Sequence, residues 1–408
     1  MCGFTFTVFL SAFQLFPTAP FRILELGGST FASGLFLGLL TYASATSAPL
    51  TGAVADRIGR RRTLLVSSGV ILLCAIGYGA ATRYQLMLAL VVVHGVFWSG
   101  LLSASAAYLT NLLPERRRAE GIGYWGLSSV AAIAVSPPIA FWIMQHGGWR
   151  WVSISCGALN ALMGAIAWTL PDESPAHQSD AGPTRASAPA AADAGATGTA
   201  AWAEGPGGRA AGVDPRVRPG IGPRVRRVVE WRVLLLSVTL FMYSYGYGAI
   251  TSFSAMFADA LGVSPKSLYL TLLAVVILLT RPLSGALADR VGYRRVFMPC
   301  LVLIALGLAV LANASSLAWF AVSAIVFGLG FGTAYPVFVA FVMRDVHAAR
   351  RGAAFGAILA AFDTGIGTGS STVGWLIDRF GFSTAFGVAA ALSAIALPYF
   401  VVVERRLR

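Results

Sequence analysis

The sequence predicts an all-α integral membrane protein, with twelve transmembrane helices in two pseudo-symmetric six-helix bundles. Its composition, its long apolar segments and an internal repeat support this prediction. Of the 408 residues, 57% are hydrophobic and only 12% are charged, and the mean hydropathy is +0.73. A soluble domain carries roughly 25% charged residues, because its surface has to be solvated. Most of this chain is therefore expected to lie in lipid.

Twelve apolar segments have about the 20 residues that a helix needs to cross the hydrocarbon layer. They span approximately 2–21, 31–54, 63–82, 85–109, 121–145, 149–170, 231–257, 267–288, 296–314, 316–343, 352–377 and 383–403. The first could be mistaken for a signal peptide. It lacks a basic n-region and a small-residue cleavage site, so we expect a true helix.

The basic residues indicate the orientation, because Arg and Lys accumulate in cytoplasmic loops. With the amino terminus inside, 24 of the 30 basic residues fall in cytoplasmic segments and five on the opposite face, while Arg281 lies within a span. The net charge of +13 is then a topology signal rather than a sign of nucleic-acid binding. We expect a multi-pass protein of the inner (cytoplasmic) membrane with both termini cytoplasmic.

Residues 171–230 interrupt the pattern, since 31 of these 60 residues are Ala, Gly or Pro. Such a segment cannot bury enough surface to offset its ordering entropy. We expect a disordered cytoplasmic linker between an N-terminal six-helix bundle (1–170) and a C-terminal one (231–408). Its arginine-rich second half is either an ordinary solvated segment or a surface that lies against anionic headgroups.

The four cysteines, Cys2, Cys74, Cys156 and Cys300, lie in apolar stretches and form no CxxC or Cys/His spacing. The sequence implies neither a disulfide framework nor a metal site, and it contains no cofactor motif. Two glycine-rich stretches, at 328–332 and 365–369, superficially resemble a nucleotide-binding turn. Both lie inside apolar spans, and we expect them, like the pair Gly34 and Gly38, to serve close helix packing.

An internal repeat relates the two halves of the chain at a fixed offset of 233 residues. The segment 52–62, GAVADRIGRRR, recurs at 285–295 as GALADRVGYRR. The same offset superimposes Pro49 on Pro282 and Gly148 on Gly381, without a gap over about 100 residues. The chain is therefore expected to be a parallel duplication, an arrangement that places a substrate site between the halves.

These residues carry a resemblance to the major facilitator superfamily. Its signature G-x-x-x-D-R-x-G-R-R is matched at Gly52, Asp56, Arg57, Gly59, Arg60 and Arg61. A weaker second copy comprises Gly285, Asp289, Arg290, Gly292 and Arg294, with Tyr293 where an Arg is typical. The resemblance implies the major facilitator fold, and a gating cluster that latches the halves together in the outward-open state. The alternative is a topology-setting basic loop without a gating role.

Ionisable side chains inside the membrane are candidates for function, because they are expensive to place there. Asp363 lies eleven residues into its span, about 16 Å along the helix axis and near the bilayer centre. We expect it to couple transport to protons or to contact substrate, or else to be a structural hydrogen-bonding group. His94 is a second proton-coupling candidate, with a packing role as the alternative. For Arg281 the sequence favours a side chain that snorkels to the interface over one in a cavity.

By resemblance, the first, fourth, seventh and tenth helices line a central cavity. The polar and aromatic residues on these helices are candidate substrate contacts: Gln14, Trp98, Tyr243, Tyr247 and Tyr335. Tyr243 and Tyr247 are four residues apart and share a helix face. Packing or interfacial roles are the alternative for each of them.

No Walker motif is present, so uphill transport would have to use an ion gradient. The chain resembles twelve-span drug:proton antiporters and sugar-efflux proteins, which implies alternating access and proton-coupled efflux of a small organic solute. It departs from them at Val91, where an Arg is typical, and at Ser136-Pro137-Pro138, where a Gly-Pro pair is typical.

A proton-coupled importer, a uniporter and a non-transporting membrane sensor remain alternatives to this function. An enzyme is not expected, since no catalytic cluster is visible. The expected partners are a small organic solute, protons and the lipid bilayer, with no nucleic acid, and the chain is expected to be monomeric. The largely apolar cavity residues favour a neutral or amphipathic solute.

Overall fold

The computed structural model describes residues 1–113, 118–171, 231–347 and 350–407, and these ranges are almost entirely helical. The helices are α1 (Cys2–Glu25), α2 (Thr30–Ile58), α3 (Arg60–Ala80), α4 (Tyr84–Leu112), α5 (Arg118–Thr169), α7 (Trp231–Ala260), α8 (Leu268–Val291), α9 (Tyr293–Ala312), α10 (Leu317–Met343) and α11 (Arg351–Leu407). Each contains a stretch long and apolar enough to cross a membrane. The predicted linker lies outside the described residues, apart from Pro171.

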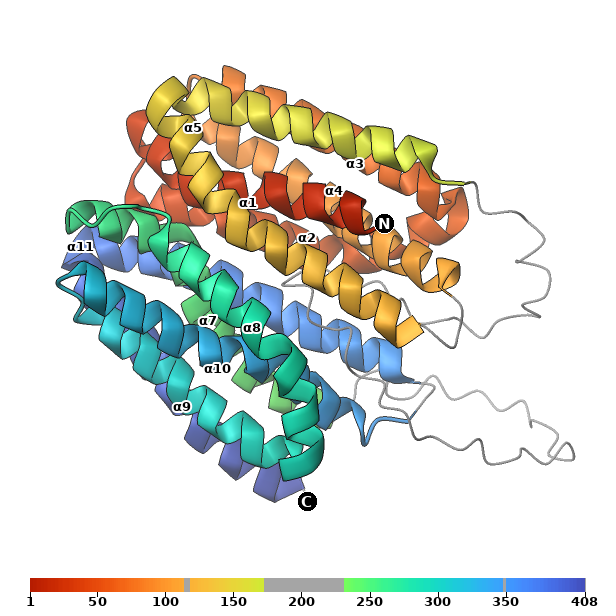
Figure 1. Cartoon of the computed structure of the whole chain (residues 1–408), viewed down its shortest axis with the longest axis vertical. Helices are drawn as coiled ribbons and strands as arrows, with labels where there is room; N and C mark the ends of the chain where they lie inside the picture. Colours follow the sequence, from red (N-terminus) through yellow and green to blue (C-terminus); the bar gives the residue numbers. More distant parts are fainter. Residues whose placement is uncertain (114–117, 172–230, 348–349, 408) are drawn as a thin grey trace, which may run out of the picture.

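Helices α5 and α11 are too long for a single crossing and fold back on themselves (Figure 1). At 1.5 Å per residue each would extend roughly 80 Å if straight, more than twice the hydrocarbon thickness. The bends lie at Gly148 and Gly381, whose φ angles of +70° and +79° are accessible to glycine without a steric penalty. With each bent helix counted as two arms, the described residues form the twelve helical segments that the sequence predicts. The bends are equivalent positions of the repeat.

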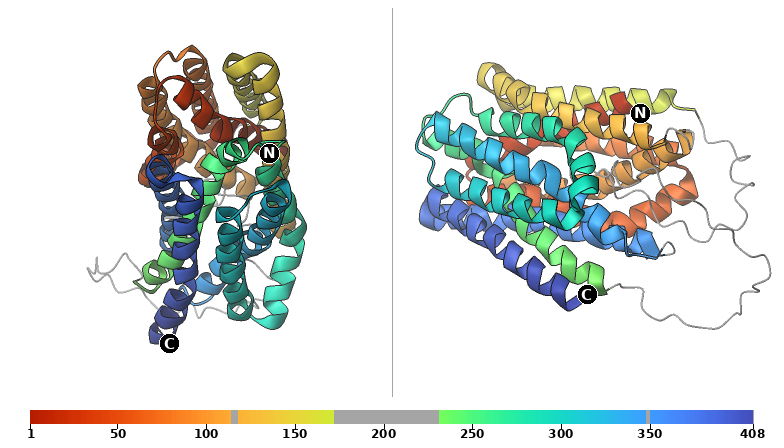
Figure 2. Two further views of the ribbon diagram at one scale, coloured as in Figure 1. Left: turned by 90° about the vertical axis from the view of Figure 1, so that its left-hand side faces the viewer. Right: turned by 60° about the horizontal axis from the view of Figure 1, so that its bottom comes forward.

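The helices form two halves, α1 to α5 and α7 to α11, which lie side by side (Figure 1). Both chain termini lie toward the end of the bundle opposite the fold-backs of α5 and α11, as Figures 1 and 2 show. We call the end with the turns at Gly59 and Gly292 the basic end, since most arginines of the described residues lie there. The opposite end, with the bends at Gly148 and Gly381, is the bend end.

The same helix pairs pack together in both halves. In the first half α1 packs on α5, α2 on α4 and α3 on α5; in the second half α7 packs on α11, α8 on α10 and α9 on α11. The contacts between the halves are also equivalent, since α2 packs on α11 and α5 packs on α8. The predicted pair of pseudo-symmetric six-helix bundles is therefore confirmed.

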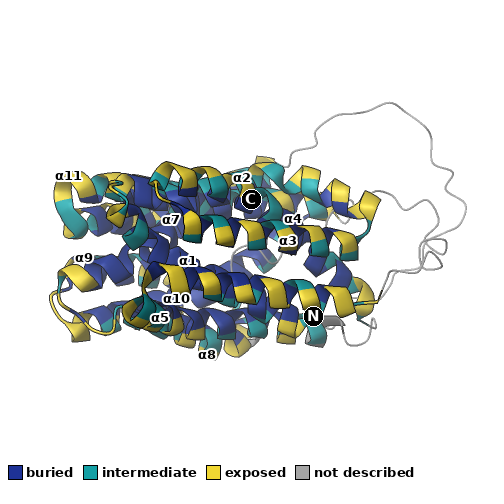
Figure 3. Cartoon of the chain, turned by 90° about the horizontal axis from the view of Figure 1, so that it is seen from above, coloured by how far each residue is buried: buried dark blue, intermediate teal, exposed yellow. Residues whose placement is uncertain are grey.

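The surface of the bundle carries many exposed apolar side chains, as expected for a protein surrounded by lipid. Residues such as Leu50, Leu73 and Leu283 are about two-thirds exposed. Figure 3 shows buried residues concentrated on the inward faces of the helices and exposed residues on the outward faces. The core is therefore formed by the inward faces of the helices.

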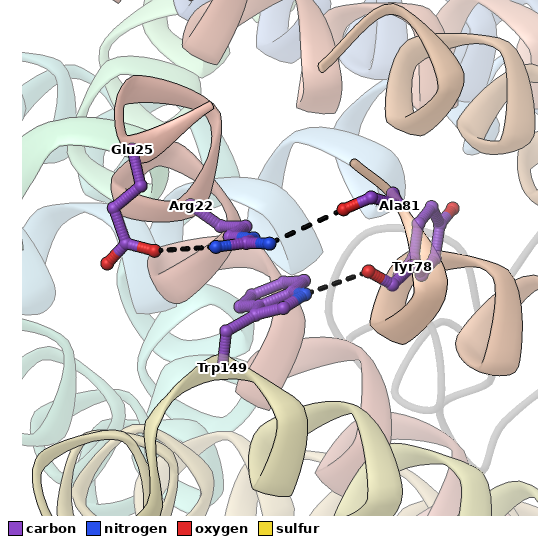
Figure 4. Close-up of polar contacts among 5 residues, drawn as sticks. All are labelled: Arg22, Glu25, Tyr78, Ala81 and Trp149. Carbon is purple, nitrogen blue, oxygen red and sulfur yellow. Dashed lines mark hydrogen bonds and ion pairs between the residues drawn. The ribbon is translucent and has the colours of Figure 1, made fainter. Parts of the chain in front are cut away.

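Hydrogen bonds near the bend of α5 connect three helices of the first half (Figure 4). The indole N–H of Trp149 donates to the carbonyl of Tyr78 at 2.8 Å. Arg22 pairs with Glu25 at 3.0 Å and donates to the carbonyl of Ala81 at 3.4 Å. These bonds connect the end of α3 to α1 and to the second arm of α5.

Candidate functional site

A cavity lies between the two halves and is lined by both. The lining residues come from α1, α2, α4, α7 and α11: Phe9, Phe13, Phe16, Leu37, Leu40, Thr41, Ser44, Trp98, Tyr247, Thr251, Asp363 and Ile366. Its free volume is about 30 Å³, which is room for only a few water molecules. The wall is aromatic and aliphatic, with a few hydroxyl groups and one carboxyl group. It therefore offers mainly apolar surface with a few polar groups.

Asp363 supplies the carboxyl group of the cavity wall. It lies twelve residues after Arg351, the first residue of α11, or about 18 Å along the helix axis, so it lies deep in the bundle. Its side chain is 5% exposed. A carboxyl group in apolar surroundings is stabilised in its protonated form, whereas contact with water favours its ionised form. Asp363 is therefore placed where opening and closing of the cavity would change its proton affinity.

An aromatic cluster of the second half supports the cavity wall beside Asp363. Tyr247 stacks on Phe331 with ring centroids 4.4 Å apart. Tyr243 packs edge-on against Phe331 and Phe362, and Tyr335 packs against Phe362 at 5.0 Å. The structure thus brings the three predicted tyrosines together, but only Tyr247 lines the cavity. Tyr243 and Tyr335 pack behind this wall.

Trp98 forms the corresponding wall in the first half. Its ring packs edge-on against Phe9 at 5.7 Å and Phe16 at 6.3 Å, and all three residues line the cavity. Gln14 lies behind them, buried, with its Oε1 3.9 Å from the thiol of Cys156 on α5. Of the first-half candidates, Trp98 therefore reaches the cavity and Gln14 does not.

His94 is buried one turn before Trp98 and is not part of the cavity wall. Its Nδ1 lies 3.2 Å from the hydroxyl of Tyr78, and its ring packs against Trp98 with centroids 6.1 Å apart. The same Tyr78 accepts the indole hydrogen bond of Trp149 through its carbonyl. His94 thus belongs to the hydrogen-bonded network that connects α3, α4 and α5.

The position of Arg281 corrects the expectation of a side chain that snorkels to the interface. The side chain is 1% exposed and lies close to Tyr247 and Tyr335. It shares the buried face of α8 with Ser284, and this face packs toward α10 and α5. The exposed leucines at 279, 283 and 287 mark the opposite, lipid-facing side. Their four-residue spacing was the sequence signal that could have placed Arg281 inside the bundle.

Close contact between α2 and α11 seals the cavity toward the bend end. The hydroxyl of Ser370 donates to the carbonyl of Gly34 at 2.8 Å, and the hydroxyls of Tyr42 and Thr368 are 2.8 Å apart. A methyl group added to Gly34 or Gly38 would collide with α11. The close packing predicted for these glycines is confirmed, and their partner is a helix of the other half.

Asp378 strengthens the same contact and was not singled out from the sequence. Its two carboxylate oxygens accept hydrogen bonds from the backbone N–H groups of Thr30 at 3.1 Å and Phe31 at 2.9 Å. A carboxylate is favoured at a helix N-terminus, where N–H groups lack partners within the helix. The partners are 348 and 347 residues apart, so no local sequence pattern could reveal the contact.

The two copies of the repeated motif form the tight turns that join α2 to α3 and α8 to α9. Gly59 and Gly292 have φ angles of +93° and +98°. In the first copy, Asp56 lies 4.0 Å from Arg60 of the same turn. In the second, the hydroxyl of Tyr293 donates to Asp289 at 2.5 Å. These contacts lie within one half each.

Two arginines of the motif copies bind the last helical arm of their own half. Arg61 donates to the carbonyl of Trp168 at 2.6 Å, and its guanidinium lies 5.7 Å from the centroid of the Trp168 ring. Arg294 pairs with Glu404 at 3.5 Å. These contacts of two predicted gating residues also lie within one half each.

A salt bridge at the basic end joins the start of α7 to the end of α10. Arg232 lies 2.6 Å from Asp345, and Arg344 lies 3.3 Å from the same carboxylate. Partial burial alone would raise the pKa of Asp345, but hydrogen bonds and charge attraction from the two arginines outweigh it and lower this pKa.

Two equivalent helix bundles around a shared central cavity define a polytopic membrane transporter. The sequence profile of the Major Facilitator Superfamily matches residues 1–275 and 235–408, and the chain belongs to this superfamily. The predicted family is thereby confirmed.

Individual relatives are distant. The MFS-type transporter YhhS of Escherichia coli strain K12 is 22% identical over 382 residues, which cover 91% of this chain and 83% of YhhS. The multidrug export protein EmrB of Haemophilus influenzae is 24% identical over 144 residues, which cover 35% of this chain and 28% of EmrB.

Solved structures share the fold. The nucleoside transporter NupG has a TM-score of 0.71 at 14% identity, with 98% of this chain and 97% of NupG covered. The human organic anion transporter MFSD10 (TETRAN) has a TM-score of 0.64 at 16% identity, with 98% of this chain and 97% of MFSD10 covered. At these identities the likeness concerns the fold alone.

Proposed function

We propose that this transporter is a secondary active exporter that works by alternating access and exchanges protons for a small organic solute. The observation that carries the proposal is the buried carboxyl group of Asp363 in a cavity lined by both halves. Such a group binds a proton from the side to which the cavity opens and releases it after the cavity opens to the other. Proton movement and solute movement would then share one site.

The equivalence of the contacts between the halves supports alternating access. The packing of α2 on α11 closes the bend end in this conformation. We place the basic end in the cytoplasm, because Arg and Lys resist translocation. The bend end, which then faces away from the cytoplasm, is the closed end, and rocking of the halves would separate α2 from α11 while bringing the halves together at the basic end. The contact of Asp56 with Arg60 of its own half suits a latch that is released while the bend end is closed.

The cavity wall favours an amphipathic organic solute. Aromatic rings such as Trp98 and Tyr247 offer flat apolar surfaces, and Thr41 and Thr251 offer hydroxyl groups. Export rather than import is supported by the local similarity to a protein that is named a multidrug exporter. An importer or a uniporter of the same fold is the competing function.

The test of proton coupling uses purified protein in proteoliposomes. A thermal-shift screen first identifies a solute that binds, because a ligand of the folded state raises the unfolding temperature. The wild type should then move this solute against its gradient when a pH gradient is imposed, with protons moving in the opposite direction. Asp363→Asn should abolish gradient-driven flux but still bind the solute.

The matched control is Asp259→Asn, which removes an exposed carboxylate paired with Lys266 at the bend end. It should transport like the wild type. If Asp363→Asn retains wild-type gradient-driven flux, the proposed proton site is wrong. Co-directional movement of solute and protons would indicate an importer, and flux independent of pH would indicate a uniporter.

A further inference from the structure

A groove lies on the outer surface of the second half, remote from the central cavity, between α9 and the last arm of α11. Its floor is apolar, formed by Met298, Val302 and Leu303 of α9 and Leu397 of α11. Arg294 and Arg295 lie at one end. The groove has a volume of about 700 Å³, which is in the range of sites for small organic ligands.

The polarity of the groove changes along the helix axis. The two arginines lie in the first turn of α9, at the basic end, where membrane headgroups are expected. Leu303 lies eight residues after Arg295, about 12 Å further along the axis, within the apolar part of α9. A ligand that matches this groove has an anionic head and an apolar chain.

The mouth of the groove has a surplus of positive charge. Arg294 pairs with Glu404, whose side chain is only 5% exposed. Arg295 is exposed, and Arg405 and Arg406 are exposed in the last turn of α11. The charge of Glu404 is thus engaged within the protein, while several arginines at this end face outward.

The equivalent region of the first half is arranged differently. Arg61, the equivalent of Arg294, lies under the ring of Trp168 and donates to its carbonyl. The residue equivalent to Trp168 in the second half is Val401, which has no ring to cover an arginine. In the first half, therefore, an aromatic side chain covers the arginine, whereas in the second half no ring covers Arg294 from the equivalent position.

We propose that the groove binds an anionic phospholipid. Arg295, together with Arg294, binds the phosphate, and an acyl chain lies along Met298, Val302 and Leu303. Basic pockets between helices at the cytoplasmic membrane surface are suited to anionic headgroups, and the apolar floor gains from burying the chain. A zwitterionic lipid lacks the net charge that the arginines complement.

The experiment measures lipid binding to the full-length purified protein by native mass spectrometry, with phosphatidylglycerol and phosphatidylcholine as probes. The wild type should bind its first phosphatidylglycerol more tightly than phosphatidylcholine. Arg295→Gln should weaken that first binding about fivefold, the effect of one surface arginine on an anionic lipid. Val302→Trp should reduce binding of both lipids, because the indole would fill the path of the chain.

The matched control is Arg62→Gln, the equivalent exposed position of the first half, which should bind like the wild type. The proposal is overturned if Arg295→Gln binds phosphatidylglycerol as tightly as the wild type. It is also overturned if Arg62→Gln loses as much affinity for phosphatidylglycerol as Arg295→Gln does. Equal affinity of the wild type for both lipids would overturn it too. Competition by soluble glycerol 3-phosphate at equal concentration would indicate a phosphate site rather than a lipid site.

Discussion

At the scale of single residues, the two ionisable candidates from the sequence have different surroundings. Asp363 lies in the cavity wall, where the proposed rocking of the halves would change its access to water. His94 lies behind the wall, hydrogen-bonded to Tyr78. Both residues lie at similar depth in apolar spans, so depth alone could not separate them. The direction in which each side chain points supports the proposed proton coupling at Asp363 and favours a packing role for His94.

This difference predicts the behaviour of His94→Gln. The glutamine amide can replace the hydrogen bond to Tyr78 but cannot titrate. Gradient-driven transport should therefore stay close to the wild-type rate, and the free energy of unfolding should fall by about 1 kcal/mol, because the packing of the imidazole ring on Trp98 is lost. Transport in proteoliposomes and thermal unfolding in detergent measure the two effects. Loss of gradient-driven flux with unchanged solute binding would instead make His94 part of the proton path.

At the scale of helices, we propose that the contact between α2 and α11 controls access to the cavity from the bend end. Gly38→Val should force these helices apart, because its side chain would meet Ser371 and the carbonyl of Gly367. The readout is labelling of Thr41→Cys, in the cavity wall, by a membrane-impermeant thiol reagent added from the bend end. Cys2→Ser provides the background, since Cys2 is the exposed cysteine among the described residues.

We expect Gly38→Val to increase this labelling several-fold, because it disfavours the closed contact. Gly69→Val is the matched control, since a side chain at Gly69 meets no atom within 4 Å, and it should label like the parent. Equal labelling of Thr41→Cys in the parent protein and in the Gly38→Val and Gly69→Val variants would show that the α2–α11 contact does not control access to the cavity.

The salt bridge between α7 and α10 predicts a pH dependence of stability. The folded-state pKa of Asp345 is lowered, so its contribution is present above the unfolded pKa, about 3.9, and is lost as pH falls through the lowered folded value. Asp345 is 32% exposed, so solvent screening limits the contribution to about 0.5 kcal/mol. Asp345→Asn should lower the unfolding temperature slightly at pH 7.

The difference in unfolding temperature between Asp345→Asn and the wild type should shrink as pH falls below about 4. Thermal unfolding of both proteins across this range measures it. A difference that grows on acidification would contradict the assigned role of the two arginines.

At the scale of the whole molecule, the repeat accounts for most of what the sequence could predict. The fixed offset indicated two equivalent bundles, and the structure places the bends at the equivalent residues Gly148 and Gly381. The apolar spans, however, did not reveal which helices pack together. Their hydrophobic faces meet either lipid or protein, and both surroundings select the same residue types.

Long-range polar contacts were unpredictable for a related reason. The partners of Asp378 lie at the start of α2, in the other half of the chain. Asp378, Thr30 and Phe31 are not unusual in their local sequences, and only the arrangement of the two bundles brings them together. Arg281 was misplaced because its depth was considered without the orientation of its helix.

In the proposed motion the two halves rock about the shared cavity, so that one end opens as the other closes. Double electron–electron resonance tests this motion on two pairs of spin labels at equivalent positions of the repeat. One pair, Thr82 and Ser315, lies at the bend end, and the other, Ile58 and Val291, lies at the basic end; all four residues are exposed. If the halves rock, acidification or solute binding should change the two distances in opposite directions. Distances that both stay constant in a transporting protein, or that change in the same direction, would contradict it.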